Sequence, residues 1–213
     1  MTVWPHITPS WVDLLFPGLV WRLEGSGDPT VYLSFDDGPH PQITPWVLDC
    51  LDEVGAKATF FCVGANAERY PALVAEIQRR GHEVGNHTHR HLNGWKNGLS
   101  TYTKDVKQAS EHLSTPLFRP PYGKIFPWQY AALRKDYRVI MWSVLTCDYN
   151  RSIDGAQCLE NALVAGNGDI VLFHDSEKAE PNLRYALPKW LQAMHQRGLL
   201  IRSVSSGLSN HAS

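Results

Sequence analysis

An apolar strand ends in two adjacent carboxylates at Val31-Tyr32-Leu33-Ser34-Phe35-Asp36-Asp37-Gly38-Pro39. The Gly-Pro pair breaks the strand directly after the carboxylates, so both of them are expected at its carboxyl end. Neighbouring Asp side chains repel each other unless a cation, a proton or a hydrogen-bond donor compensates them. The same string is also compatible with a solvated turn in which Asp side chains accept hydrogen bonds from nearby backbone N–H groups. A compensating group elsewhere in the chain decides between these two interpretations.

Imidazoles that could supply such a group follow at Asn86-His87-Thr88-His89-Arg90-His91. His87 and His91 are four residues apart, a spacing that lets two rings meet one metal ion. One Asp with two His leaves coordination positions open for water and substrate, as in catalytic rather than structural zinc sites. Surface histidines that share one face are the alternative. His89 is expected to point away from the metal.

Composition indicates a globular domain with no affinity for nucleic acid. The chain has 213 residues, 43% of them hydrophobic, and a formal net charge of -1. This length suits one domain with a substantial core, and the scattered Lys and Arg residues form no basic run. The four cysteines form no C-x-x-C pair and are expected to be buried free thiols. The Trp and Tyr residues are expected in the core or as platforms for sugars.

The chain is expected to comprise an N-terminal extension (1–29) packing on or beside the domain, a catalytic domain (30–205) and a C-terminal tail (206–213). The N-terminus lacks a positively charged region, and Asp13 and Pro17 interrupt its apolar residues. This pattern is not a recognisable signal peptide, and no later run is long enough to span a bilayer. We expect a cytoplasmic monomer, with association with the cell envelope left open.

Short β-rich runs alternate with helical patterns from Thr30 onward. The predicted strands are Val31–Phe35, Ala58–Val63, His82–Asn86, Leu117–Arg119, Val139–Val144, Ile170–His174 and Leu199–Val204. Between them, Thr44-Pro45 is expected to cap a helix that runs to Val54. Strand-helix alternation predicts parallel strands with right-handed crossovers, in a barrel or an open doubly wound sheet.

The polar residues with catalytic potential favour the barrel. They follow the first strand (Asp36 and Asp37), the third (His87 and His91), the fourth (Arg119 to Tyr122), the fifth (Asp148) and the sixth (His174). Carboxyl ends of strands converge on one face of a barrel but spread along a ridge in an open sheet. The predicted fold is therefore α/β, a distorted and incomplete barrel with about seven parallel strands.

Two further segments carry chemistry. The first contains Arg119 followed by two stiff prolines, in Leu117-Phe118-Arg119-Pro120-Pro121-Tyr122-Gly123. This arrangement suits a guanidinium that is held beside Asp36. It also suits a fixed backbone N–H that donates to an oxyanion. A turn that merely ends a strand is the alternative. Ile170-Val171-Leu172-Phe173-His174-Asp175 ends a buried strand in a titratable ring.

These four segments together resemble the motifs of the polysaccharide deacetylase family, carbohydrate esterase family 4. The family's T-F-D-D-G-P motif corresponds to Ser34–Pro39 and its H-[ST]-x-x-H motif to His87–His91. Its R-x-P-Y motif corresponds to Arg119–Tyr122 and its L-x-H motif to Leu172–His174. The four motifs occur in the family's order over residues 30 to 205, and the resemblance implies a distorted, incomplete α/β barrel.

The resemblance also implies a role for each matched residue. Asp37, His87 and His91 would hold a divalent metal, usually zinc, with Asp36 as the general base. Arg119 would position Asp36, the backbone N–H of Tyr122 would stabilise the oxyanion, and His174 would be the general acid. The residues expected to line the substrate site are Trp95, Pro120, Trp142, Asp148 and Leu172.

One segment departs from the family pattern. In the D-x-x-D-W motif we expect the first Asp to support the acid histidine, and Leu145 stands in that place, with Tyr149 for the Trp. His174 is therefore expected to lack its usual carboxylate. Asp148 or Asp175 would substitute, and we favour Asp148.

The implied activity is removal of N-acetyl groups from an amino-sugar glycan, such as peptidoglycan, a chitin oligomer or a related N-acetylglucosamine substrate. A metal-activated water would attack the acetyl carbonyl. The alternatives are an esterase of acetylated xylan, a hydrolase of a ring amide in a small nitrogen compound, and a carbohydrate-binding protein that retains the metal with little turnover.

Overall fold

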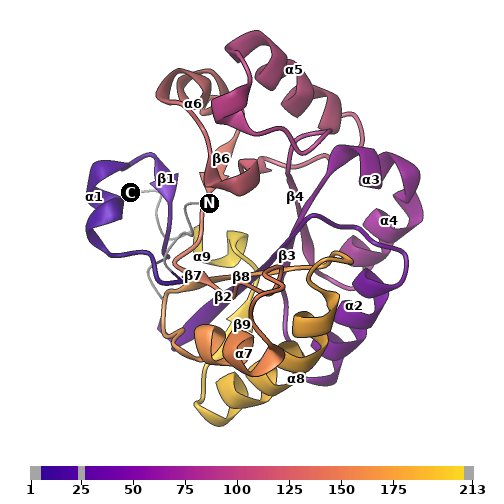
Figure 1. Cartoon of the computed structure of the whole chain (residues 1–213), viewed down its shortest axis with the longest axis vertical. Coiled ribbons are helices and arrows are strands. Elements are labelled where there is room, and N and C mark those ends of the chain that lie inside the picture. Colours follow the sequence, from indigo (N-terminus) through magenta and orange to yellow (C-terminus); the bar gives the residue numbers. More distant parts are fainter. Residues whose placement is uncertain (1–5, 24–26, 209–213) are drawn as a thin grey trace.

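The computed structural model describes residues 6–23 and 27–208, in which strands and helices alternate as predicted (Figure 1). The parts of the expected extension and tail at residues 1–5, 24–26 and 209–213 lie outside the described residues. The strands are β1 (Leu19–Val20), β2 (Thr30–Asp36), β3 (Thr59–Cys62), β4 (Glu83–Asn86), β5 (Leu117–Phe118), β6 (Arg138–Ile140), β7 (Val144–Leu145), β8 (Ile170–His174) and β9 (Leu200–Arg202). The α-helices are α1 (Trp11–Leu15), α2 (Ile43–Glu53), α3 (Gly64–Arg69), α4 (Pro71–Arg79), α5 (Leu99–Ala109), α6 (Pro127–Leu133), α7 (Gly155–Leu163), α8 (Glu180–Gln196) and α9 (Ser205–Leu208), and the 3-10 helices are η1 (Gly94–Lys96) and η2 (Pro121–Gly123).

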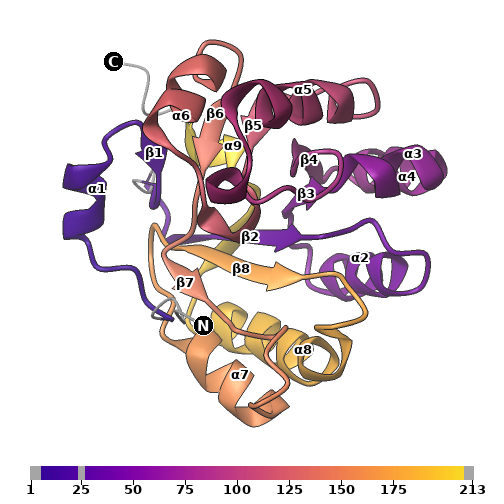
Figure 2. The ribbon, with the colours of Figure 1, turned by 45° about the horizontal axis from the view of Figure 1, so that its top comes forward.

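The named strands all pair in parallel, in the order β1-β6-β5-β4-β3-β2-β8-β7, with β9 also beside β2. Within the described residues no ladder joins β7 to β1 or β6, so the sheet curves without closing. Figure 2 shows α2 and α8 alongside β2 and β8, on the outside of the curved sheet. The predicted α/β fold, an incomplete barrel, is confirmed.

Each of the seven predicted strands is present at least in part, but the prediction of one strand over Val139–Val144 is wrong. This segment divides into β6 and β7, which lie toward opposite ends of the sheet. The Met141 N–H donates to the Val20 oxygen, whereas the Ser143 N–H donates to the Ile170 oxygen. The chain therefore crosses from one end of the sheet to the other within three residues, which an apolar run cannot reveal.

Helix α2 begins two residues earlier than predicted, at Ile43, and Thr44 does not cap it. Thr44 is buried inside the first turn, where its hydroxyl accepts the His40 N–H at 2.7 Å and donates to the Asp175 carboxylate. Thr44 thus connects α2 to the end of β8.

Residues 6–23 contact both ends of the open sheet. The Thr8 N–H donates to the Ser143 oxygen and the Leu145 N–H to the His6 oxygen, which places this part against β7. Further along, β1 pairs with β6 at the other end. Arg22 fastens the segment through an ion pair with Asp169 at 3.2 Å.

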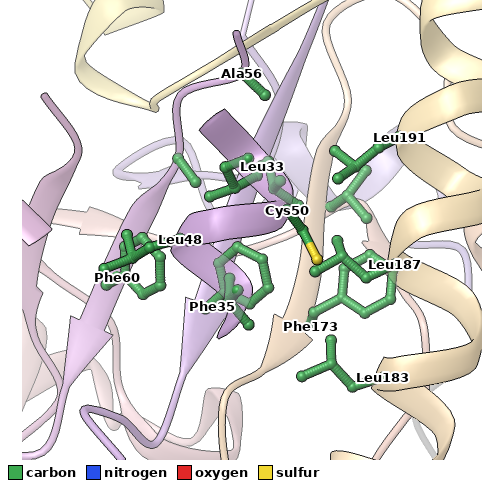
Figure 3. Close-up of a cluster of buried hydrophobic side chains, with 14 of the residues drawn as sticks. Leu33, Phe35, Leu48, Cys50, Ala56, Phe60, Phe173, Leu183, Leu187 and Leu191 are labelled. Carbon is green, nitrogen blue, oxygen red and sulfur yellow. The ribbon is translucent and has the colours of Figure 1, made fainter. Parts of the chain in front are cut away.

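The larger core cluster lies between the sheet and the outer helices (Figure 3). Leu33 and Phe35 from β2 and Phe173 from β8 meet Leu187 and Leu191 from α8. The rings of Phe35 and Phe173 lie 6.1 Å apart. This packing fixes β2 and β8 side by side, and therefore fixes the positions of their last residues.

A second apolar cluster fills the inner side of the sheet and includes Tyr32, Phe61, Trp142, Leu145 and Leu172. Trp142 is 4% exposed and Leu172 is 1% exposed. Both side chains therefore offer only a small surface to a ligand, and their place in the substrate site stays a prediction.

In the described ranges, no helix combines the length and the apolar content that crossing a bilayer requires.

Candidate metal and catalytic site

The alternation of side chains along two strands aims polar groups at the inner side of the sheet. On β2, Val31, Leu33 and Phe35 face the outer helices, so Ser34 and Asp36 face inward. On β8, Val171 and Phe173 face outward, so His174 faces inward. Because β2 and β8 pair in parallel with Asp36 beside His174, the strand register itself brings these two groups to one face.

Asp37, His87 and His91 form a cluster that fits one metal ion. The Asp37 Oδ1 lies 3.1 Å from the His91 Nε2 and 3.8 Å from the His87 Nε2. One ligand atom from each residue lies within 4.8 Å of the other two. Two imidazoles and a carboxylate are a common donor set for zinc and related transition metals. The cluster therefore suits the predicted metal.

His87 is oriented to present its Nε2 to that cluster. Its Nδ1 lies 2.8 Å from the Arg119 backbone oxygen, so the ring proton sits on Nδ1 and Nε2 carries a free lone pair. Burial disfavours the charged ring, and it lowers the pKa of His87 to about 4 despite the nearby carboxylates of Asp36 and Asp37. A neutral imidazole with an aimed lone pair is the form that binds metal.

Asp37 remains ionised. Burial alone would raise its pKa, but the hydrogen bond with His91 and the positive charge of His174 outweigh burial and hold the pKa of Asp37 well below its usual range. Asp37 is therefore available as an anionic ligand.

Several residues of the site have left-handed backbone conformations that L-amino acids rarely adopt. Their φ angles are 79° at Asp37, 61° at Thr88, 55° at His91, 61° at Tyr122 and 60° at Cys147. Each costs about 1–3 kcal/mol and persists only where the surrounding structure enforces it. All five follow the carboxyl ends of strands, at the same end of the sheet as the clustered Asp and His side chains.

Arg119 holds Asp36 in place from the interior of the sheet. The guanidinium is fully buried and donates from Nη1 to the Asp36 Oδ1 at 2.8 Å and to the Ser34 Oγ at 2.9 Å. It also donates to the backbone oxygens of Ile140 and Met141. Arg119 and Asp36 thus meet as predicted. The role of Ser34 was not predicted, although its place two residues before Asp36 on an alternating strand signals it.

His174 has a carboxylate partner, as predicted. The Asp148 carboxylate accepts the His174 backbone N–H at 2.7 Å and lies 2.8 Å from the His174 Nδ1. Burial opposes protonation of the ring, but the charge and hydrogen bond of Asp148, with Asp37 and Asp36 farther away, raise the pKa of His174 to about 9. Leu145 packs in the inner apolar cluster instead. Leu145 thus leaves its position without a carboxylate, and the predicted substitution by Asp148 is confirmed.

Asp175 is not a partner of the His174 ring. Its carboxylate accepts the Thr44 hydroxyl, and burial raises the pKa of Asp175 to about 8. The second alternative for the supporting carboxylate is therefore not realised.

Asp105 organises the loop that carries the histidines, a role that sequence reasoning missed. Its buried carboxylate accepts the backbone N–H groups of His89 and Arg90 at 2.9 Å each and forms an ion pair with the Arg90 Nε at 2.6 Å. Asp105 lies in an amphipathic helix whose charged residues otherwise face solvent, so nothing in the local pattern separates it from them.

One exposed aromatic ring contacts the metal cluster, and a row of three further rings follows His91 in the chain. Tyr122 has its ring centre 4.6 Å from that of His91 and is 52% exposed. The Trp95 ring lies 6.4 Å from that of Phe126, and Phe126 stacks on Trp128 at 4.3 Å. Trp95 and Trp128 are both more than half exposed. Of the remaining residues expected to contact substrate, Pro120 and Asp148 are buried, and Asp148 contacts His174 instead.

The fold and this constellation define an α/β-barrel hydrolase site built around one metal ion. The profile of the family described as polysaccharide deacetylase matches residues 24–138. The chain is 32% identical over 195 residues to a peptidoglycan-N-acetylglucosamine deacetylase of Bacillus cereus, covering 88% of this chain and 91% of that protein. It is 34% identical over 203 residues to a chitooligosaccharide deacetylase of Sinorhizobium fredii, covering 84% of this chain and 92% of that protein.

A solved structure agrees with these relatives. A peptidoglycan N-acetylglucosamine deacetylase in complex with 4-naphthalen-1-yl-N-oxidanyl-benzamide superimposes with a TM-score of 0.83 at 30% identity, covering 94% of this chain and 96% of that one. This chain belongs to the polysaccharide deacetylase family, carbohydrate esterase family 4.

Proposed function

We propose that this protein hydrolyses the N-acetyl groups of glycans that contain N-acetylglucosamine. The observation that carries the proposal is that two adjacent carboxylates face different partners. Asp37 faces His87 and His91, whereas Asp36 faces Arg119. One carboxylate is thus available to a metal ion and the other to a proton. The names of the relatives, which are peptidoglycan and chitooligosaccharide deacetylases, support an N-acetylated amino sugar as substrate.

Asp37, His87 and His91 would hold the metal, and we expect zinc because two imidazoles and one carboxylate suit it. When bound, the ion would acidify a water molecule and polarise the acetyl carbonyl.

Asp36 would act as the general base that takes the proton from the attacking water. The fixed positive charge of Arg119, which donates to Oδ1 at 2.8 Å, favours the ionised carboxylate and leaves Oδ2 available. The Asp36 Oδ2 lies 3.7 Å from the His87 Nε2, so the base is adjacent to the proposed metal position.

His174 would donate a proton to the leaving amine nitrogen. Asp148 fixes its Nδ1, so Nε2 is the nitrogen that can deliver the proton. The raised pKa keeps the ring protonated at neutral pH. The backbone N–H of Tyr122, in its left-handed turn, would donate to the oxyanion that forms on the carbonyl.

The exposed rings of Trp95 and Trp128, with the half-buried ring of Phe126 between them, would bind further sugars of the chain. Trp95 follows His91 by four residues, and the Lys124 ammonium lies 5.1 Å from the centre of its ring. Aromatic rings stack on the apolar faces of sugars, and a row of them would prefer an oligomer to a monomer.

Acetate release against a panel of acylated glycans tests the proposal. We expect release from N-acetylglucosamine oligomers or peptidoglycan fragments that stops after chelation and returns with zinc. Release from acetylated xylan alone would favour the esterase. Oligosaccharide binding without release from any acylated sugar would favour a binding protein.

The aromatic row can be tested with Trp95→Ala. Stacking of this kind is worth about 0.5–1.5 kcal/mol, so kcat/KM for a long oligomer should fall about twofold to tenfold. The shortest accepted oligomer should be affected least, and Trp95→Phe should restore most of the loss. Equal losses on short and long oligomers would argue against a sugar contact at Trp95.

Zinc as the ion, a cytoplasmic location and a monomeric state remain predictions. Metal analysis of the purified protein, cell fractionation and light scattering, respectively, would test them.

A further inference from the structure

A second cluster of metal-ligating side chains lies behind the loop that carries His87 and His91. Glu68 on α3, His89 in the loop and His112 just beyond α5 each offer one ligand atom, and these atoms lie within 4.8 Å of one another. The Glu68 Oε2 is 3.7 Å from the His89 Nε2 and 3.9 Å from the His112 Nε2. The two rings lie 6.1 Å apart and are tilted by 31°.

We propose that Glu68, His89 and His112 form a second binding site for a divalent transition-metal ion such as zinc. Two imidazoles and a carboxylate match the donor types of the first cluster and suit zinc, copper or nickel rather than magnesium or calcium. The proposal does not rest on the deacetylase activity.

The spacing of these groups favours a bound ion over a simple hydrogen-bonded pair. Distances of 3.7 and 3.9 Å are too long for hydrogen bonds, which lie near 2.7–3.2 Å. Ligands around a tetrahedral zinc with bonds of about 2.0–2.2 Å are about 3.3–3.6 Å apart. The first cluster has separations of 3.1 and 3.8 Å, so the second resembles it. The Glu68 side chain is 58% exposed and can move the remaining few tenths of an ångström.

The His89 ring presents its Nε2 to the other two residues from a buried position. The residue is 6% exposed, and its Nε2 lies 3.7 Å from the Glu68 Oε2. Burial penalises polar atoms of an imidazole that lack partners, and an ion bound to Nε2 would compensate that atom. The Nδ1 faces Gly64 on the other side of the ring and is not part of the proposed site.

An ion at this position would join three elements around the catalytic loop. The His89 backbone is already held on both sides, because its N–H donates to Asp105 at 2.9 Å and its oxygen accepts the Ala65 N–H at 3.0 Å. Coordination of His89 by an ion shared with α3 and the end of α5 would restrict the segment between His87 and His91. The second ion is thus expected to raise the thermal stability of the protein.

Metal titration of the chelator-treated full chain tests the proposal. Calorimetry with zinc, and absorption with cobalt, should show two equivalents in the wild type and one in His112→Ala or Glu68→Gln. His87→Ala should lose the first site and retain the second. His195→Ala removes an exposed imidazole elsewhere and serves as the matched control, which should keep two equivalents.

Thermal unfolding gives a second readout that does not depend on turnover. The wild type should gain stability with the second equivalent of zinc, and His112→Ala should not. A single equivalent in the wild type, or two equivalents in both His112→Ala and Glu68→Gln, would overturn the proposal.

Discussion

The proposed base side of the site, at Asp36, and the proposed acid side, at His174, each pair one carboxylate with one cationic side chain. Only the pair on the acid side can change its charge near neutral pH. On the base side, Arg119 carries a permanent charge and is held by four hydrogen bonds in the interior of the sheet. On the acid side, His174 gains or loses its proton, and Asp148 biases that equilibrium toward the charged ring.

This difference suits the proposed roles of general base and general acid. A general base must be ionised when the water attacks, and a neighbouring cation that cannot lose its proton keeps it ionised. An acid must give up its proton during the reaction and recover it afterwards, which only a titratable ring can do near neutral pH. The same type of contact, a buried ion pair at 2.8 Å, therefore fixes the charge on one side and sets a proton affinity on the other.

The largest expected effect comes from removing the base. Asp36→Asn keeps the shape of the side chain and an oxygen for Arg119, but its amide cannot accept the proton. We expect kcat for acetate release to fall by about 10²–10⁴-fold with the zinc content unchanged. Asp37→Asn is the matched control and should lose metal and activity together. Full activity in Asp36→Asn would assign the base elsewhere.

A smaller effect is expected on the acid side from Asp148→Asn. Removal of a carboxylate that orients and charges a functional histidine typically costs about 10–100-fold in activity. Because Asp148 raises the pKa of His174, its loss should also move the alkaline limb of the pH–rate profile to lower pH.

The limb moves to lower pH because His174 can act as an acid only while its ring is protonated. In the wild type the rate should fall as His174 deprotonates, near pH 9. A bound cation would offset part of the charge of Asp37, and it would therefore place this limb at or below that pH. In Asp148→Asn the limb should approach the ordinary histidine value of about 6.5. Asp154→Asn makes the same change at an exposed helix cap and should leave the profile unchanged. An unshifted limb in Asp148→Asn would argue against His174 as the acid.

The smallest effect is expected at Leu145. Its side chain packs among apolar neighbours, so Leu145→Met conserves volume and should cost less than about 1.5 kcal/mol of unfolding free energy. We expect kcat within about twofold of the wild type and the same alkaline limb. A shifted limb would show that Leu145 influences His174 after all.

Sequence motifs predicted the contact between Asp36 and Arg119 directly, and they predicted the contact between Asp148 and His174 only as one of two alternatives. Asp36 and Arg119 are each named by a motif, and their meeting follows from inward alternation on β2 and the carboxyl end of β5. Asp148 lies beyond the end of β7, where no alternation fixes the direction of a side chain. Its contact with His174 depends on how β7 pairs with β8, and that pairing was hidden because β6 and β7 read as one strand.

The residues that support the site were the least predictable. Asp105 and Thr44 act through contacts with segments far away in the sequence, at the histidine loop and at Asp175. The local pattern places Asp105 on the exposed surface of a helix and Thr44 at a helix cap. In the structure, tertiary contacts bury both side chains instead. The burial of Trp142 and Leu172 has the same origin, because an aromatic or aliphatic residue at a strand end suits a core and a ligand wall equally well.

The placement of residues 6–23 against β6 and β7 has a consequence for solubility. An incomplete barrel has two strand edges whose backbone donors and acceptors invite pairing with another molecule. Here His6 and Thr8 bond to the edge at β7, and β1 pairs with β6 at the other edge. Strand β1 is only two residues long, so it presents a short new edge. A chain trimmed to the residues that carry the motifs would retain every catalytic group and yet expose both edges. Such a chain is expected to aggregate through pairing of exposed edge strands between molecules. Residues 6–23 are therefore expected to prevent this self-association.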